Sequence, residues 1–300
     1  MEPVYLAGVA LAALAAALLA VQNVAIRIGT DRGDVGDAVI VVMGTNLVLV
    51  APLAAARYYP TYGLTREAAT AFAAAGIVGL LLGRVCTYAG IEAIGASRTT
   101  PVVSASALVS TVLAVWLLEE SLTPTHAVGI VLIVAGVAII SWSTAADAGA
   151  NASLRDVGLS LLLPLAAAVF VGIEPVLVRI GLESGTPIPV GLTVMMTAAL
   201  VGYLAYRRLR GLAVPGLTRN PHARWYLAAG VASTVGLLAY FAALASAPVV
   251  IVIPIVHTAP LLVIALSVAF LPRRLERVSW PLVVAAAAVV VGASLVSLSG

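Results

Sequence analysis

The chain has 300 residues, of which 62% are hydrophobic and only 10% are charged. Soluble domains are about 45–50% apolar and roughly 25% charged, so this composition excludes an ordinary soluble protein. It also excludes a disordered chain, whose signature is low hydrophobicity with high charge. The net charge of +3 comes from arginines scattered along the chain, not from one basic face, which argues against a nucleic-acid partner. The composition therefore places the chain in a membrane.

Ten segments are long and apolar enough to cross a bilayer, which takes about 20 mostly apolar residues in helical form. In chain order they are Val4–Ala25, Gly36–Ala56, Ala68–Glu92, Ser97–Leu118, Pro124–Trp142, Val157–Ile180, Pro187–Tyr206, Trp225–Ser246, Val249–Leu271 and Ser279–Leu298. The longest polar stretch lies near the middle of the chain. We therefore expect an all-α integral membrane protein with ten transmembrane helices, organised as residues 1–143, a polar linker over 144–156, and residues 157–300.

The two halves of the chain resemble each other at a shift of 152 residues. The matching pairs include Arg27 and Arg179, Gly29 and Gly181, Met43 and Met195, and Tyr88 and Tyr240. Each half is expected to hold five helices, an odd number, so two similar halves must enter the bilayer from opposite sides. This is the inverted-repeat plan of many secondary transporters, in which a site between the halves is exposed alternately to each side. The repeat thus predicts two inverted five-helix halves.

Several short motifs carry a resemblance to a known family. They are Asn23–Arg27, Tyr88–Ile91 with Gly95–Pro101, Leu117–Thr123 followed by Gly129–Ile133 and Gly136, and, in the second half, Thr258–Leu261. Together they resemble the EamA-like branch of the drug/metabolite transporter superfamily, over the whole chain. The resemblance implies a ten-helix secondary carrier of small metabolites, often an exporter, located as a multi-pass protein in the cell membrane.

The orientation in the membrane stays open at this point. The odd-numbered loops between the expected spans hold twelve of the 16 arginines, and the even-numbered loops hold three. By the positive-inside rule this bias places the odd loops in the cytoplasm and both termini outside. The family resemblance implies the reverse orientation, with both termini inside.

Arg84 is the first candidate functional residue, because it lies in the middle of the third expected span. A lipid-facing arginine there costs about 2.5–3.5 kcal/mol on insertion scales, so Arg84 is expected to face the interior. Tyr88 follows four residues later on the same helical face. We interpret the two residues as the wall of a substrate cavity in which Arg84 binds an anionic group. The alternative is a structural ion pair that holds helices together.

Glu174 is the second candidate, and the shift of 152 residues places it on Gln22. Burial favours the neutral form of a carboxyl group, which makes Glu174 the candidate residue for proton coupling; the alternative is a structural pair with an arginine. His257, in the ninth span, is a candidate substrate or proton ligand or a neutral core residue. Asn23 and Tyr240, the repeat partner of Tyr88, complete the expected substrate-binding set.

The motifs of other functional classes are absent from the sequence. There is no His-Glu-x-x-His or Gly-x-Ser-x-Gly motif, so we expect no enzyme. Cys86 is the single cysteine, and the absence of lysine rules out the nucleotide-binding loop that requires one. We expect no cofactor, no metal and no ATP. The expected partners are a small-molecule substrate and membrane lipid, with a homodimer left open. A passive channel or uniporter, a membrane scaffold and an intramembrane lipid enzyme are the alternatives to a transporter.

Overall fold

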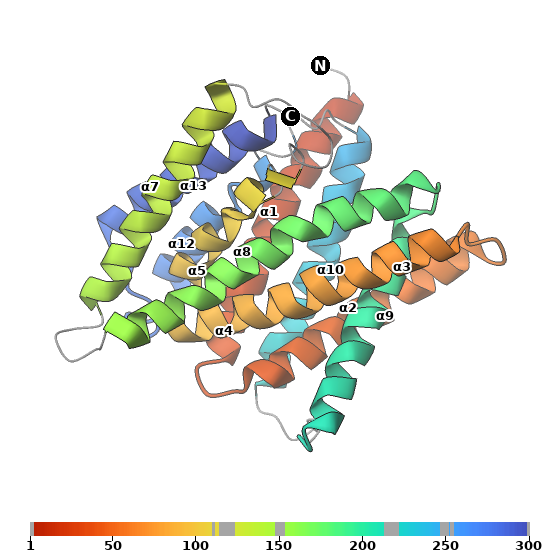
Figure 1. The fold of residues 1–300 in the computed structure, drawn as a ribbon, viewed down its shortest axis with the longest axis horizontal. Coiled ribbons are helices and arrows are strands. Elements are labelled where there is room, and N and C mark those ends of the chain that lie inside the picture. The colour runs from red at the N-terminus through yellow and green to blue at the C-terminus, as the bar shows by residue number, and fades with distance from the viewer. Residues whose placement is uncertain are drawn as a thin grey trace.

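The structure is a computed structural model that describes residues 3–109, 112–113, 124–147, 154–212, 222–246, 252 and 255–298. Within this part of the chain every regular element is a helix. The helices are α1 (Pro3–Gly29), α2 (Val35–Tyr58), α3 (Arg66–Ala75), η1 (Gly76–Gly83), α4 (Arg84–Ile94), α5 (Ala96–Ser104), α7 (Pro124–Asp147), α8 (Leu154–Glu183), α9 (Ile188–Leu209), α10 (Ala223–Ser246), α12 (Ala259–Phe270) and α13 (Trp280–Leu298). Figure 1 shows them as one bundle.

Six helices of the described part are long and apolar enough to cross a membrane, and three shorter apolar helices accompany them. The third of the six runs without a break from Arg66 to Ile94 and contains α3, η1 and α4, so it spans the segment expected over Ala68–Glu92. Its middle turns, η1, are π-helical. The chain is therefore an all-helical, multi-pass membrane protein.

The expected linker over 144–156 includes the ends of two helices. Helix α7 continues to Asp147 and α8 already begins at Leu154, while residues 148–153 lie outside the described part. Polar side chains do not by themselves stop a helix, because its backbone bonds are internal and its end can project into water.

The fourth and ninth expected spans are not the continuous helices that their hydropathy predicted. Helix α5 ends at Ser104 and a turn at Ala105 precedes further helical residues at 106–109. In the second half, a turn at His257 and Thr258 separates helical Ile255 and Val256 from α12. The two breaks are 152 residues apart and therefore lie at equivalent positions of the repeat. Parts of both spans, 110–111, 114–118, 249–251 and 253–254, lie outside the described residues.

Equivalent helices of the two halves pack against the opposite half. Helix α1 packs along α10, and its repeat partner α8 packs along the α3–η1–α4 helix. Helix α2 contacts both α9 and α10, and α9 in turn contacts α3 and η1. The pairs α2 with α9 and α7 with α13 are formed between partners in the repeat, and Figure 1 shows α7 and α13 side by side. The first helix of each half thus lies against the third helix of the other half.

Glycines make these exchanged contacts close. A side chain at Gly29 would overlap the ring of Tyr226 on α10, and a side chain at Gly181 would overlap the ring of Phe72 on α3. Gly29 and Gly181 are partners in the repeat. Small residues let transmembrane helices approach closely, so that packing takes the place of the hydrophobic effect, which is lost in lipid. Close packing of an aromatic ring against a glycine therefore joins the halves at two equivalent positions.

Helix ends and loops of the two halves contact each other in two groups, one at each end of the bundle. At one end the hydroxyl of Tyr226 donates to the carbonyls of Gly29 and Asp34, and Arg207 pairs with Asp34 at 3.8 Å. At the end of α2 remote from Asp34, Thr186 Oγ1 donates to the carbonyl of Gly63 at 2.8 Å. The end of α1 and the loop after it therefore contact the end of α9 and the start of α10, and the loop after α8 contacts the loop after α2. Helices α2 and α9 consequently run antiparallel.

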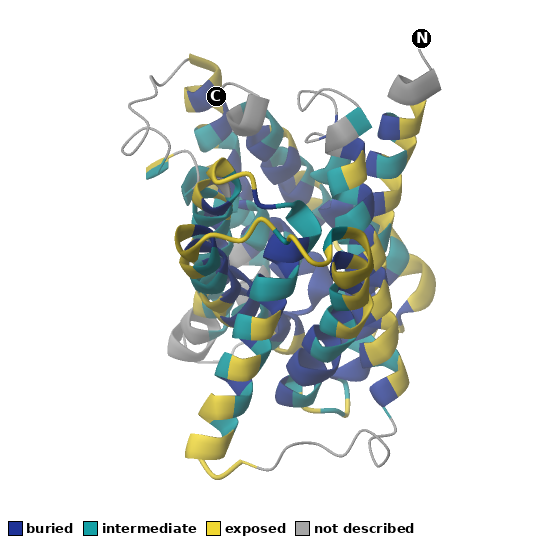
Figure 2. Cartoon of the chain, turned by 90° about the vertical axis from the view of Figure 1, so that its right-hand side faces the viewer, coloured by how far each residue is buried: buried dark blue, intermediate teal, exposed yellow. Residues whose placement is uncertain are grey.

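The outer surface of the bundle is apolar. Val48 is 70% exposed, Val268 67% and Phe270 72%, and Figure 2 shows exposed positions along the outward sides of the helices with buried positions inside. In water so much exposed apolar surface would favour aggregation, but in a bilayer it faces acyl chains at no cost. The exterior therefore fits the membrane setting that the composition predicts.

Gly136 on α7 provides a test of the close packing between α7 and α13. A Cβ atom there would lie 2.7 Å from the carbonyl oxygen of Ala285, a backbone atom that cannot rotate away. We expect Gly136→Ala to destabilise the protein by about 1–3 kcal/mol, the usual cost of overpacking. The measurement is thermal unfolding in detergent.

Gly44→Ala is the matched control, because Gly44 also lies inside a helix but has open space around it. Its melting temperature should stay unchanged or rise, since alanine is the better helix former. Equal melting temperatures for the two variants would contradict the described contact.

Candidate functional site

A cavity of about 370 Å³ lies between the two halves. Its wall is formed by residues from α1, the α3–η1–α4 helix, α5, α8, α9, α10 and α12, together with residues at the two helix breaks. Most of the lining is leucine, valine and other apolar side chains, with a few polar groups among them. Small-molecule sites have this character and a volume of about 300–1,000 Å³. Both halves contribute to the wall.

Arg84 faces this cavity, and its guanidinium is hydrogen-bonded to neutral side chains on two other helices. Its Nη2 donates to Ser233 Oγ on α10 at 3.2 Å. The amide of Asn46 on α2 satisfies its neighbours when its oxygen faces the guanidinium, and it then accepts from Nη1 at 2.8 Å and from Nη2 at 3.1 Å. Within the described part of the chain Arg84 forms no ion pair with a carboxylate. The guanidinium is thus oriented by hydrogen bonds while its charge stays available to the cavity.

Glu174 lines the same cavity from α8. Its carboxyl group lies against the backbone of Gly79 in η1, where any larger residue would overlap it. The structure gives this carboxyl no hydrogen bond or ion pair to another described residue, and Arg84 lines the same cavity. Pro175 follows within α8 and lacks an N–H, so the carbonyl of Val171 on the cavity wall loses its helical donor. The carboxyl group of Glu174, the guanidinium of Arg84 and the carbonyl of Val171 therefore share one largely apolar cavity.

The π-helical turns of η1 explain how the cavity wall comes so close to α8. Gly76, Gly79 and Gly83 all lie in this segment and meet Met195, Glu174 and Val171, respectively. Short π-helical stretches inside α-helices occur frequently at functional sites. Arg84 follows directly after η1, at the first residue of α4.

Gln22, Asn23 and Tyr88 form a connected part of the wall. Gln22 Nε2 donates to the hydroxyl of Tyr88 at 3.0 Å, and the side chain of Asn23 donates to the carbonyl of Leu19 on its own helix. Tyr88 has no solvent-exposed surface and Gln22 is 8% exposed. Both therefore support the wall from within the packing, whereas Asn23 is half-buried.

His257 reaches the cavity from the break before α12. Its Nδ1 is buried and has no hydrogen-bond partner among the described residues. The break is closed locally by Thr258, whose hydroxyl donates to the carbonyl of Ile255 at 2.6 Å.

Tyr240 is the one expected site residue that the structure does not bring to the cavity. On α10 the cavity is lined by Ser233, Leu237 and Phe241, which are spaced by four and share one helical face. Tyr240 lies off that face and packs against a separate apolar cluster that includes Ala12. Tyr240 therefore matches Tyr88 in the sequence repeat, but its side chain points to a different side of its helix.

Sequence reasoning did not identify Ser233 as a partner of Arg84. A lone serine in a helix of alanine and glycine carries no signal of its own. Its position beside Arg84 depends on residues 149 positions apart in the chain.

This geometry defines a class of protein: a multi-pass helical membrane protein with a partly polar cavity between two similar halves. The EamA-like transporter family matches residues 6–142 and 158–298. The chain belongs to this family, which confirms the resemblance inferred from its motifs and gives it a transporter fold. No curated relative matches the sequence.

A solved structure, titled only as the crystal structure of a protein, is similar to the chain over its whole length. It matches with a TM-score of 0.65 at 18% identity, covering 96% of this chain and 95% of the other. A likeness at this identity supports the fold and carries nothing about the substrate.

The hydrogen bond between Gln22 and Tyr88 can be tested by a double-mutant cycle. Gln22→Leu leaves a buried hydroxyl without its donor and Tyr88→Phe leaves a buried amide without its acceptor, so each should lower the free energy of unfolding by about 1–3 kcal/mol. The double variant should cost less than the sum, with a coupling of at least about 0.5 kcal/mol. Unfolding in detergent measures all three.

Tyr240→Phe is the control at the equivalent position of the repeat. Its hydroxyl has no bond to another described residue, so its removal should leave stability unchanged. Additive effects of Gln22→Leu and Tyr88→Phe would show that the bond is not formed in the membrane protein.

Proposed function

We propose that the protein is a secondary transporter that exports a small metabolite or drug across the cell membrane by alternating access. It has ten transmembrane helices in two inverted five-helix halves, residues 1–143 and 157–300, joined near 144–156. The observation that carries this proposal is the cavity, which lies between the two halves and holds an arginine and a carboxylate that are not paired with each other. Unpaired charges are costly inside a membrane and mark substrate or ion pathways.

The inverted arrangement is supported by the loop contacts. The end of the first helix of the first half meets the start of the third helix of the second half, as Tyr226 with Gly29 illustrates, and the loop after α8 meets the loop after α2, as Thr186 with Gly63 illustrates. These two contacts lie at opposite ends of α2, so equivalent loops of the two halves lie at opposite ends of the bundle. A two-fold axis in the membrane plane produces this relation.

Alternating access is supported by the two breaks, at Ala105 and at His257, at equivalent positions beside the cavity. Discontinuous helices line the substrate sites of many transporters with inverted repeats. The packing of α1 with α10 and of α8 with the α3–η1–α4 helix also gives two equivalent interfaces between the halves, about which one half can rock against the other. A site between them can then open to either side.

The cavity favours a small molecule with an anionic group and an apolar body. Arg84 is presented to the cavity by Asn46 and Ser233 as a cation that no described carboxylate neutralises by an ion pair, and apolar side chains such as Leu192 and Phe241 cover much of the remaining wall. Arg84, Asn23, Gln22, Tyr88 and His257 form the proposed binding set. Tyr88 and Gln22 act by holding the wall, while Arg84 and His257 contact the substrate.

A flux screen on purified protein in proteoliposomes tests the function as a whole. Saturable transport of a substrate that competes with its analogues supports a carrier. Flux that does not saturate indicates a channel, and absence of flux for every class of metabolite indicates a scaffold. Conversion of a lipid or substrate into a new compound would indicate an intramembrane enzyme.

Arg84→Gln should raise the KM for an anionic substrate by about 10–100-fold, because a hydrogen bond to a charged group contributes about 1.5–3 kcal/mol. Transport kinetics in proteoliposomes measure the change. Arg57→Gln is the matched control, since Arg57 lies at the exposed end of α2 over the ring of Tyr58, and its KM should stay within about twofold of the unmodified protein. An unchanged KM for a folded Arg84→Gln protein would favour the structural interpretation of Arg84.

Glu174→Gln should abolish uptake or efflux driven by a proton gradient while substrate exchange in the absence of a gradient continues, because glutamine keeps the shape of the side chain and cannot bind a proton. The control is Glu67→Gln at the exposed start of α3. If the Glu174→Gln protein keeps the same gradient-driven rate and pH profile, Glu174 is not the coupling residue.

A further inference from the structure

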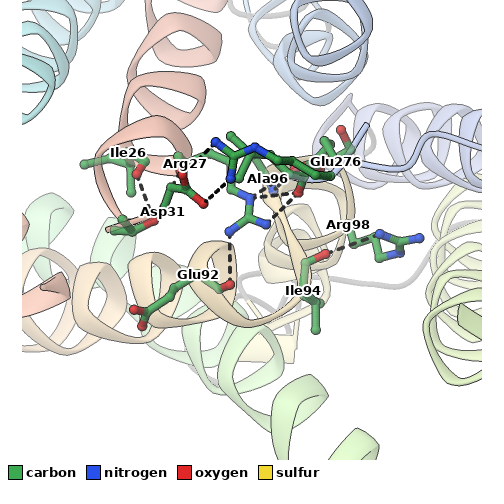
Figure 3. A network of polar contacts seen from close by, with 12 residues as sticks. Ile26, Arg27, Asp31, Glu92, Ile94, Ala96, Arg98 and Glu276 are labelled. Atoms are coloured by element: carbon green, nitrogen blue, oxygen red, sulfur yellow. Dashed lines mark hydrogen bonds and ion pairs between the residues drawn. The ribbon is translucent and has the colours of Figure 1, made fainter. Parts of the chain in front are cut away.

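At one end of the bundle the two halves are joined by a buried polar contact outside the cavity. Arg27, in the last turn of α1, reaches across to the segment between α12 and α13 and pairs with Glu276, with 3.4 Å between Nε and Oε2. Its Nε also donates to the carbonyl of Leu275 at 3.2 Å, and its Nη1 donates to the carbonyl of Glu92 at 3.1 Å. Figure 3 shows these residues converging. We call the pair of Arg27 and Glu276 with these bonds the latch.

Glu276 has a second role in the latch, because it binds the start of α5. Its carboxylate accepts from the backbone N–H of Ser97 at 2.6 Å and from that of Ala96 at 3.2 Å. These N–H groups lack helical partners and carry the positive end of the helix dipole. Gly95, with φ of +91°, allows the approach, since a Cβ there would overlap the carboxylate. One side chain from the second half therefore holds two elements of the first half.

The latch is almost completely removed from solvent. The side chain of Glu276 has no exposed surface and that of Arg27 is 14% exposed. Removing one partner of a buried pair is costly, because it leaves the other charge uncompensated in a low-dielectric setting. Here both charges also have backbone hydrogen-bond partners, so several polar contacts hold the two halves together at this point.

The latch lies one helical turn beyond the cavity on three helices. Arg27 follows Asn23 by four residues on α1, and Glu92 follows Tyr88 by four on α4. On α5, Ala96 precedes Thr100 by four, and the hydroxyl of Thr100 donates to the carbonyl of Ala96 at 2.7 Å. Asn23, Tyr88 and Thr100 all line the cavity. The latch therefore lies one helical turn beyond this end of the cavity.

From this placement we infer that the latch is the gate at this end of the cavity, with Glu276 as the residue that sets how often the gate opens. The inference rests on the proposed alternating access, in which the halves must separate at this end once per cycle. Separation requires Glu276 to leave both Arg27 and the start of α5. The free energy of the latch then sets the population of the state open at this end.

A second ion pair nearby provides the matched control. Asp31 accepts from both terminal nitrogens of Arg274, each at 3.1 Å, and links the same two segments of the chain. The side chain of Arg274 is 61% exposed, and exposed pairs contribute little. Asp31→Asn removes a link between the halves without touching the buried latch.

The experiment measures access to the cavity from each side of the membrane. In full-length protein with Cys86 replaced by serine, Val103→Cys places a single thiol on the cavity wall. Its labelling by a membrane-impermeant maleimide is timed from each face of proteoliposomes. Arg32→Cys, at a side chain that is 75% exposed at the latch end, identifies which face is the latch face.

Glu276→Gln should raise the labelling rate from the latch face about tenfold and lower the rate from the opposite face. A tenfold change corresponds to about 1.4 kcal/mol in the equilibrium. Arg27→Gln should act in the same direction, Arg27→Lys should give an intermediate ratio, and Asp31→Asn should change neither rate by more than about twofold. The opposed changes matter because a merely loosened fold would raise labelling from both faces.

Unchanged ratios in the Glu276 and Arg27 variants, or parallel increases on both faces, would overturn the inference. The milder Arg27→Lys protein keeps the charge, so it decides the question if a neutral variant fails to insert. Labelling needs no substrate, which separates this test from the flux screen. Shifted ratios without any transport would refute the transport function and leave the latch standing, whereas transport with unshifted ratios would refute the latch alone.

Discussion

The close packing of α1 against α10, and of α8 against the α3–η1–α4 helix, is the contact on which the rest of the structure depends. In a bilayer, helices gain nothing from hiding apolar surface from water, so they associate through shape and close approach. Gly29 and Gly181 provide that approach by admitting the rings of Tyr226 and Phe72. Because each half thereby holds the other, the cavity necessarily lies between them, and movement of one half changes the cavity.

The polar residues of the interior follow from the low dielectric around them. A guanidinium in a membrane must be hydrogen-bonded, and Arg84 obtains its bonds from Asn46 and Ser233 on two different helices. Neutral partners satisfy the donors without cancelling the charge, unlike the carboxylate at Arg27. The same chain thus uses one arginine to face a cavity and another to join the two halves, and the difference lies in the charge of the partner.

The cavity and the latch are connected through short stretches of helix. Asn23 and Arg27 occupy successive turns of α1, and Thr100 and Ala96 occupy successive turns of α5. In the proposed mechanism, a ligand that draws these helices together or apart at the cavity acts on the latch one turn away. Such a connection needs no long pathway, because rigid helical turns transmit the movement directly.

Much of the architecture could be read from the sequence, because insertion into a bilayer depends on local composition. Hydropathy located the helices, internal repetition revealed the two halves, and the cost of a buried charge predicted that Arg84 and Glu174 face inward. The rotation of each helix could not be read, since a helix that is apolar on every side has no stripe to mark its inner face. Tyr240 was therefore expected in a cavity that its rotation avoids, and the breaks at Ala105 and His257 were hidden inside apolar segments. Ser233 beside Arg84 and Glu276 beside Arg27 were decided only by the tertiary structure, because each pair joins positions far apart in the chain through helix packing.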